Sequence, residues 1–147
     1  MKKKIIKIIA FIGLFGAMYA LYLFNLPHRN AKDIESEFTL GASELALQFV
    51  ENSILANETY LSDDGDSKVG IISGIVFEIG ENVKGDRYAI VRDVNSVVGV
   101  QCSFQSDEVL EIGDFVSVKG VIRSGAEFDE DFEEYIDVIM EQCLIIK

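Results

Sequence analysis

The sequence predicts a mainly β domain, a small barrel of five strands, that follows an amphipathic helix and, before it, one transmembrane helix. Five segments after residue 67 are rich in β-branched residues and are separated by Gly, Asn or Asp. Two of them carry a glycine at mid-strand, Gly74 and Gly120, which is typical of the bends that close a small barrel. In the last one, Glu141 and Gln142 interrupt the inward alternation, as a β-bulge does.

The composition fits one ordinary domain with an appendage. The chain has 147 residues, 49% of them hydrophobic, with a single Pro, which excludes collagen-like and low-complexity disordered classes. Its charge is divided unevenly: residues 1–29 carry five basic residues and no acid, whereas residues 30–147 carry a net charge of −17. We therefore expect the two parts to lie in different environments, a membrane surface and water.

Residues 1–26 are predicted to be a short cytoplasmic tip and a transmembrane signal-anchor. Residues 8–24 contain no charge, and the 20 residues from 5 to 24 would span roughly 30 Å as a helix, about one hydrocarbon core. The Lys2–Lys4 cluster favours a cytoplasmic N-terminus, so the rest would lie outside the inner membrane of a bacterium, in the periplasm. A cleaved signal peptide is the main alternative, but it has a shorter apolar run and a small-x-small site.

Residues 27–38 are predicted to be a juxtamembrane linker, because they are polar, aperiodic and contain the only Pro. Residues 39–147 form the predicted domain. It begins with an amphipathic helix over residues 39–61, with Gly41 as N-cap and Glu44 completing half of a capping box. The predicted core face, on which the helix packs, comprises Leu45, Ala46, Phe49, Val50, Ile54, Ala56, Tyr60 and Leu61.

The five predicted strands follow a turn-rich segment at residues 62–67. They cover residues 68–79, 87–93, 98–104, 114–123 and 135–146. Residues 106–110 are expected to form one or two helical turns between the third and fourth strands. Five strands with a short helix at that place match the OB-fold arrangement.

Several fragments together resemble the tRNA-anti-like OB-fold family of bacterial envelope proteins. They are PHRN at residue 27, FTLGASEL, ISGIV, VQCSF, the G-D-x-V-x-V-K-G strand and the final DVIMEQC. The resemblance covers residues from about 27 to the end, and it implies a five-stranded OB barrel with an added N-terminal helix, often secreted or lipid-anchored. Here an apparent transmembrane anchor replaces the lipid-modified cysteine. The family implies no established activity, so no catalytic residue is carried over.

A ligand-binding face is predicted on the second and third strands, where OB ligands commonly lie. Tyr88 and Arg92 share the outward face of the second strand, with Gln101 and Ser103 on the third. Nucleic acid is a poor ligand for this face, because strand binding needs a positive groove and residues 30–147 carry −17.

Cys102 and Cys143 are the predicted disulfide pair. In an OB barrel the third and fifth strands are neighbours, and an oxidising compartment would let the bond persist. Two buried free thiols are the alternative. Two cysteines and one distant histidine do not supply four zinc ligands, so no metal site is predicted.

The acidic run at residues 127–137 is predicted to be a solvated, mobile loop between the last two strands. A cationic ligand, a basic protein patch or Ca²⁺ is the functional alternative for it. The segment at 62–67 lacks the ligand spacing of a calcium loop.

No catalytic group and no cofactor is predicted. His28, the only histidine, lies beside the membrane, and no nucleophile has a histidine close in sequence. The sequence therefore predicts a membrane-anchored, extracytoplasmic OB-fold module that binds an envelope protein or a small ligand. Two alternatives stay open: single-stranded nucleic-acid or oligosaccharide binding on the barrel face, and a structural subunit of an envelope assembly, for which Gly13 and Gly16 give the anchor a small-residue face.

Overall fold

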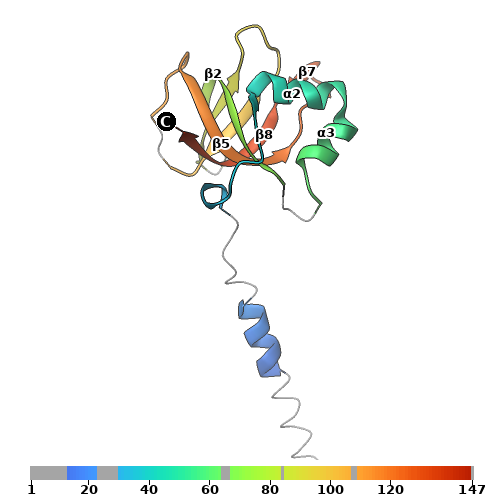
Figure 1. Ribbon diagram of the computed structural model, residues 1–147, viewed down its shortest axis with the longest axis vertical. Coiled ribbons are helices and arrows are strands. Elements are labelled where there is room, and N and C mark those ends of the chain that lie inside the picture. The colour runs from blue at the N-terminus through green and yellow to red at the C-terminus, as the bar shows by residue number, and fades with distance from the viewer. Residues whose placement is uncertain (1–12, 23–29, 64–66, 84, 107–108, 147) are drawn as a thin grey trace, which may run out of the picture.

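The computed structural model describes residues 13–22, 30–63, 67–83, 85–106 and 109–146, and its centre is a closed five-stranded barrel (Figure 1). Around the barrel, β2 pairs with β3, β3 with β4, β4 with β8, β8 with β5, and β5 again with β2. Only the β4–β8 pair is parallel within this ring. The barrel strands are β2 (Val69–Glu81), β3 (Arg87–Arg92), β4 (Val100–Phe104), β5 (Phe115–Ser124) and β8 (Val138–Ile146). The predicted mainly β barrel is confirmed.

Strand β2 closes the barrel because its two halves pair with different strands. Residues 69–75 pair with β5 and residues 75–81 with β3, so β2 changes partner beside Gly74. A Cβ at Gly74 would lie 2.9 Å from Cγ1 of Val91, which is closer than side chains normally approach. The glycine thus lets β2 bend against β3, as expected, whereas the bulge itself comes later, between Val76 and Glu78.

Strand β8 contains the predicted bulge. The pairing of β8 shifts between Met140 and Cys143 on the β4 side, and Gln142 has a φ of 55°. The extra residue lets both Met140 and Cys143 point into the barrel, where they are buried. The barrel interior is apolar throughout, and its largest fully buried side chains include Phe49, Leu45, Ile72, Ile122, Met140 and Val118.

The predicted N-terminal helix is two helices. Helix α2 (Ala42–Glu51) packs Leu45, Ala46 and Phe49 on the barrel, and the Oε2 of Glu44 accepts a bond from the N–H of Gly41, as expected. Asn52 ends α2, and its Oδ1 caps α3 (Ser53–Tyr60) by accepting from the N–H of Leu55 at 3.1 Å. Asparagine is a preferred N-cap, so the first helix ends here and a second one begins.

The break changes the buried face of the second half. In α3, Ala56 and Tyr60 are buried as predicted, and the hydroxyl of Tyr60 donates to Oε1 of Gln48 at 2.7 Å. Ile54, however, is 73% exposed, although a continuous helix would bring it to the core. The assignment of Ile54 to the buried face was wrong, because a new N-cap resets the helical phase.

Part of the predicted linker packs on the barrel. Residues 38–41 form β1 (Phe38–Gly41), which pairs in parallel with the start of β2. Before it, the 3-10 turn η1 (Ala31–Asp33) buries Ala31 against Val69 and Val121. Small apolar side chains in an otherwise polar segment allowed this docking. Pro27 and His28 lie outside the described residues.

The acidic run is an ordered hairpin, which corrects the expectation of a mobile loop. Strands β6 (Glu127–Asp129) and β7 (Glu134–Ile136) pair antiparallel, and the rings of Phe128 and Tyr135 contact edge to face at 5.0 Å. The predicted last strand therefore breaks at Asp137, whose Oδ1 accepts from the N–H of Gly99 at 2.7 Å. Aromatic cross-strand pairing outweighs charge in ordering this segment.

The expected helical turn between the third and fourth barrel strands is not seen at Ser106, Val109 and Leu110; residues 107 and 108 lie outside the described residues. Leu110 packs against the core.

Residues 13–22 are helical. In the described residues, no helix has both the length and the apolar character that crossing a membrane requires. Residues 5–12, 23 and 24 of the predicted span lie outside those residues, so the anchor stays a prediction.

Candidate functional site

The four predicted binding residues lie on one outer face of the barrel. In β3 and β4 the buried positions, among them Ala89, Val91 and Cys102, alternate with half-buried ones that point outward. Tyr88 lies directly opposite Ser103 across the β3–β4 pair, and Ile90 lies opposite Gln101. Arg92 continues the same face at the end of β3. We call this surface the β3–β4 face.

Tyr88 is held flat by its neighbours on β2. A Cβ at Gly80, its cross-strand partner, would lie 2.6 Å from the phenol carbon and oxygen, so the ring occupies the space that the glycine leaves. The hydroxyl donates to Oε1 of Glu78 at 3.3 Å. Partial burial, then the charge of Glu78 and this bond, raise the pKa of Tyr88 above its ordinary value. The ring is a neutral, fixed platform at neutral pH.

Arg92 has no carboxylate partner among the described residues, although the domain is strongly acidic. Its guanidinium carbon lies 3.4 Å from the ring centroid of Phe77, a cation–π contact with the bulge residue of β2. Its Nε is buried and makes no hydrogen bond. A buried donor without an acceptor costs free energy.

A polar cleft of about 320 Å³ opens beside the β3–β4 face. Ser103 belongs to both, so the cleft and the face are continuous. Asn82 and Asp86 close one side: the Asn82 amide donates to Oδ2 of Asp86 at 3.1 Å, and the Asp86 N–H donates back to Asn82 at 2.9 Å. The remaining lining residues are Phe104, Gln105, Glu141 and Gln142.

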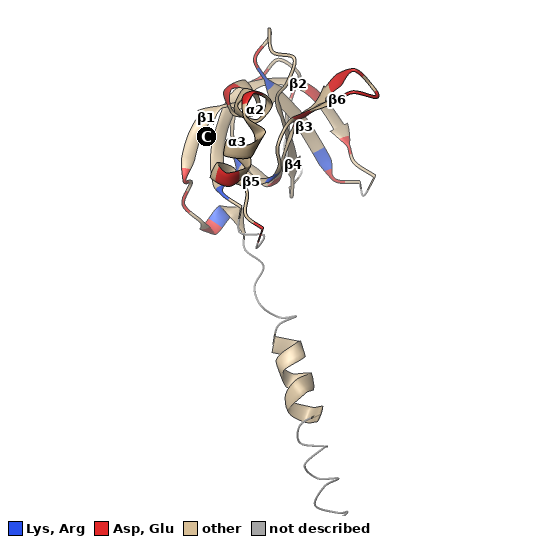
Figure 2. Ribbon diagram, turned by 90° about the vertical axis from the view of Figure 1, so that its right-hand side faces the viewer, with Lys and Arg blue, Asp and Glu red and all other residues tan. Residues whose placement is uncertain are grey.

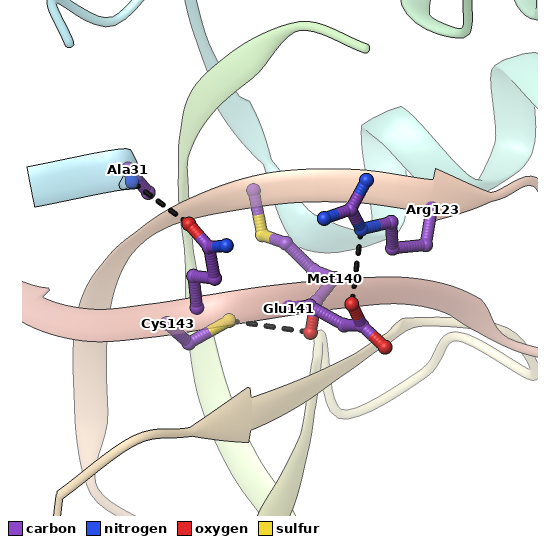
Figure 3. Close-up of polar contacts among 6 residues, drawn as sticks. Ala31, Arg123, Met140, Glu141 and Cys143 are labelled. Carbon is purple, nitrogen blue, oxygen red and sulfur yellow. Dashed lines mark hydrogen bonds and ion pairs between the residues drawn. The ribbon is translucent and has the colours of Figure 1, made fainter. Parts of the chain in front are cut away.

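The bulge of β8 fixes the other side of the cleft (Figure 3). Oε1 of Gln142 accepts from the N–H of Ala31 at 2.9 Å, which ties η1 to the barrel. Next to it, Oε2 of Glu141 accepts from Nε of Arg123 at 2.9 Å. The two adjacent polar residues of the bulge therefore both reach the surface with their orientation set by partners on other elements.

The two cysteines lie on neighbouring strands inside the barrel, as strand adjacency predicts. Cys102 is opposite Met140, and Cys143 is opposite Phe104, one step along the same pair of strands. Both are free thiols and both are buried. Burial, and then the adjacent Cys102 thiol, raise the pKa of Cys143 well above its ordinary value. The disulfide bond itself stays a prediction.

Among the described residues, no three His, Cys, Asp or Glu side chains gather closely enough to hold a metal ion. Residues 64–66 of the turn-rich segment lie outside the described part, so its carboxylates are not included in that statement.

The fold and the first 130 residues decide the family. The model of the tRNA_anti-like family matches residues 1–130, which include α2, α3 and four of the five barrel strands. The chain belongs to this family. The resemblance seen in the sequence is thereby confirmed, and β8 lies beyond the matched residues. No curated protein matches the chain significantly.

In this tRNA_anti-like protein, basic and acidic residues both lie around the β3–β4 face, and Glu141 is paired with Arg123. Arg87 and Arg92 are the only basic residues on β3 and β4, whereas Glu78, Asp86 and Glu141 border the same surface or its cleft. Two arginines provide few contacts for a polyphosphate chain, whereas amide, hydroxyl and aromatic groups are present on the face and in the cleft.

Sequence reasoning missed the partners that give this site its shape. Phe77, Glu78 and Gly80 come from the second half of β2, where the bulge shifts the alternation that a strand otherwise follows. Asn82 and Asp86 belong to the β2–β3 turn. The glycine opposite an outward tyrosine was the available signal for the platform.

Proposed function

We propose that this chain is a membrane-anchored, non-catalytic binding module that presents its OB barrel outside the cytoplasm and holds its ligand on the β3–β4 face. The observation that carries the proposal is the continuity of the face with the polar cleft through Ser103. An aromatic platform, an arginine stacked on Phe77 and a cleft lined by amides and carboxylates then form one surface.

The ligand chemistry that this surface suits best is an uncharged, polyhydroxylated chain, an oligosaccharide. Sugar rings stack on aromatic side chains, here Tyr88 and Phe77, and their hydroxyls donate to carboxylates and accept from amides and guanidinium groups. Asn82, Gln105 and Gln142 supply amides in the cleft. OB barrels bind oligosaccharides and oligonucleotides on this side of the barrel.

Nucleic acid is the weaker candidate on the same face. A stacking platform is present, but phosphate binding needs several cations, and only Arg87 and Arg92 lie on these strands. A catalytic step is not part of the proposal, because the residues that line the cleft include neither a histidine nor a cysteine.

Titration of the full chain in detergent micelles with neutral tetrasaccharides, chitotetraose and cellotetraose, and with a short oligothymidylate tests the ligand class. We expect one of the tetrasaccharides to bind by calorimetry with little dependence on salt. Tyr88→Ala should weaken that binding at least tenfold, while Phe132→Ala, a change at an exposed aromatic outside this face, should leave it intact.

Steeply salt-dependent binding of the oligothymidylate would replace the oligosaccharide with nucleic acid. Absence of binding by all three probes would overturn the proposed face. The location is tested separately by protease treatment of spheroplasts: the barrel should be digested or released only from the outer side, and protection there would overturn the extracytoplasmic assignment.

A further inference from the structure

A second groove lies apart from the β3–β4 face, between α3 and the base of the β6–β7 hairpin. It has a volume of about 550 Å³. One wall is the side of α3 that carries Ser53 and Asn57, continued by Leu61 directly after the helix. The opposite wall and the floor are formed by three segments. They are residues 123–127, from the end of β5 to the start of β6, Ile136 at the end of β7, and Ile139 in β8.

The floor of this groove is apolar and incompletely covered. Leu61 and Ile139 are half-buried, and Ile136 is 38% exposed. Helix α3 uses Ala56 and Tyr60 to contact the core, so its Ser53 and Asn57 side, with Leu61 after it, is left facing the groove. Apolar side chains that remain exposed along a groove rimmed by polar groups are typical of a surface that a partner covers.

The rim of the groove is anionic along the hairpin. Glu127 lies opposite Ile136, and Asp129 lies opposite Glu134, so these residues share the face of the hairpin that borders the groove. Arg123, the one basic residue that lines the groove, is paired with Glu141 at 2.9 Å, and residues 124–146 contain no basic residue. The carboxylates of Glu127 and Glu134 form no hydrogen bond or ion pair with another described residue. The acidic hairpin stands out in Figure 2.

The hairpin also offers main-chain groups. In the described part of the chain, β6 and β7 pair only with each other, so each has an outer edge whose N–H and C=O groups no neighbouring strand uses. An unpaired edge next to an apolar groove accepts an extended segment by strand addition, with alternate side chains entering the groove.

We propose that this groove docks an extended segment of a partner protein whose groove-facing side chains, at every second position, include both basic and apolar residues. Charge complementarity to the hairpin selects the basic residues, and the floor formed by Leu61, Ile136 and Ile139 selects the apolar ones. A second copy of this chain is the less suitable occupant, because residues 30–147 carry −17 and would bring like charge to the rim. The proposal is independent of the ligand on the β3–β4 face.

Fluorescence anisotropy of the full chain in detergent with labelled octapeptides tests the docking. The probes are a Lys-Val peptide with the repeat Lys-Lys-Val-Val, so that each face of the strand carries both residue types, a Lys-Ser peptide with the repeat Lys-Lys-Ser-Ser and equal charge, and a Glu-Val peptide with the repeat Glu-Glu-Val-Val and opposite charge. We expect the Lys-Val peptide to bind clearly more tightly than the Lys-Ser peptide, and the Glu-Val peptide not to bind.

A matched pair of double variants tests the position. Glu127→Gln with Glu134→Gln should weaken Lys-Val binding about three- to tenfold, which corresponds to two surface ion pairs. Glu35→Gln with Glu81→Gln removes the same charge from exposed sites that do not line the groove, and should change binding less than about twofold. Ile136→Ser should weaken binding, whereas Val94→Ser, at a site 74% exposed outside the groove, should not.

Equal loss in both double variants would overturn the proposal, because it would mean unspecific attraction to an acidic domain. Equal binding of the Lys-Ser and Lys-Val peptides would also overturn it, since the apolar floor would then be unused. A concentration-dependent dimer that Ile136→Ser abolishes would assign the groove to a second copy instead. Tyr88→Ala should leave peptide binding unchanged, so failure here is distinguishable from failure of the β3–β4 face.

Discussion

Strand β8 and the β6–β7 hairpin are consecutive in the chain but differ in burial and in strand pairing. β8 has a strand on each side, β4 and β5, and its inward residues Val138, Met140 and Cys143 are buried. The hairpin pairs only with itself, and Phe128 and Phe132 are 51% and 75% exposed among six carboxylates. Asp137 separates the two and bonds the N–H of Gly99 on the β4 side.

This comparison distinguishes residues that the barrel needs in order to fold from residues that it accommodates without needing them. In β8 the residue types are restricted by packing inside a closed barrel, where adding or removing one methylene group changes stability. In the hairpin, nothing in the barrel requires a run of acids, and closely spaced like charges oppose compact structure. Substitutions in β8 should therefore act on stability, and substitutions in the hairpin should act on binding. The predictions below test that division.

The largest expected effect is the loss of a core side chain from β8. Met140→Ala removes a fully buried side chain, and we expect it to lower the free energy of unfolding by about 2–5 kcal/mol. Phe132→Ala at the hairpin tip should change it by no more than about 0.5 kcal/mol. Urea denaturation of the full chain, followed by circular dichroism, measures both. Similar losses in the two variants would show that the hairpin is part of the core.

The next largest effect concerns Cys102 and Cys143. If the barrel lies in an oxidising compartment, as proposed, the protein isolated from it should contain the bond between them, and a thiol titration in denaturant without reductant should find no reactive thiol. Reduction should then destabilise the barrel by up to roughly 4 kcal/mol on the chain-entropy model. Two reactive thiols in the isolated protein would contradict the bond.

The pH dependence of stability distinguishes the two states of this pair. In the reduced protein, burial raises the pKa of Cys143 above its ordinary value of 9.0, so the folded thiol keeps its proton longer than the unfolded thiol does. This contribution to stability is fully present below the unfolded pKa and is lost as pH rises through the folded pKa. The bonded form has no thiol to titrate and should not show that loss.

A smaller effect is expected where β5 approaches the bulge of β8. A Cβ at Gly120 would lie 2.9 Å from both Sγ of Cys143 and the main-chain oxygen of Glu141. Gly120→Ala should therefore cost about 1–3 kcal/mol through overpacking. Lys119→Ala, on the opposite face of β5, is the matched control and should cost less than about 0.5 kcal/mol. Equal stability of the two variants would mean that β5 and β8 separate easily.

Much of this architecture was predictable from the sequence because it depends on local rules. Glycines at mid-strand and an interrupted alternation in the last strand predicted the closed barrel, and both features lie where strands approach closely, at Gly74, Gly120 and Gln142. The outward direction of Tyr88 and Arg92 followed from the two-residue period of β3. Periodicity predicts a face without any knowledge of its neighbours.

The remaining features depend on contacts distant in sequence. The sequence predicts a loop at residues 127–137 because the charge of this run obscures the Phe128–Tyr135 pair, which forms only once the turn has closed. Ile54 was misplaced because Asn52 starts a new helix. The polar cleft joins the β2–β3 turn, β4 and the β8 bulge, three segments whose proximity no local pattern encodes.

The smallest expected effect compares paired and unpaired carboxylates of the two regions. Glu141 of β8 pairs with Arg123 at 2.9 Å, and both side chains are well exposed, at 51% and 36%. Exposed pairs of this kind are screened by water and salt, so Glu141→Gln should cost no more than about 1 kcal/mol, and less at high salt. Glu130→Gln in the hairpin removes an exposed charge that has like-charged neighbours, so it should leave stability unchanged or raise it slightly. Urea titrations of the two variants at low and high salt compare these effects. A stability loss in Glu130→Gln equal to that in Glu141→Gln would mean that the hairpin carboxylates support the fold, and it would remove the main reason to assign them to a partner.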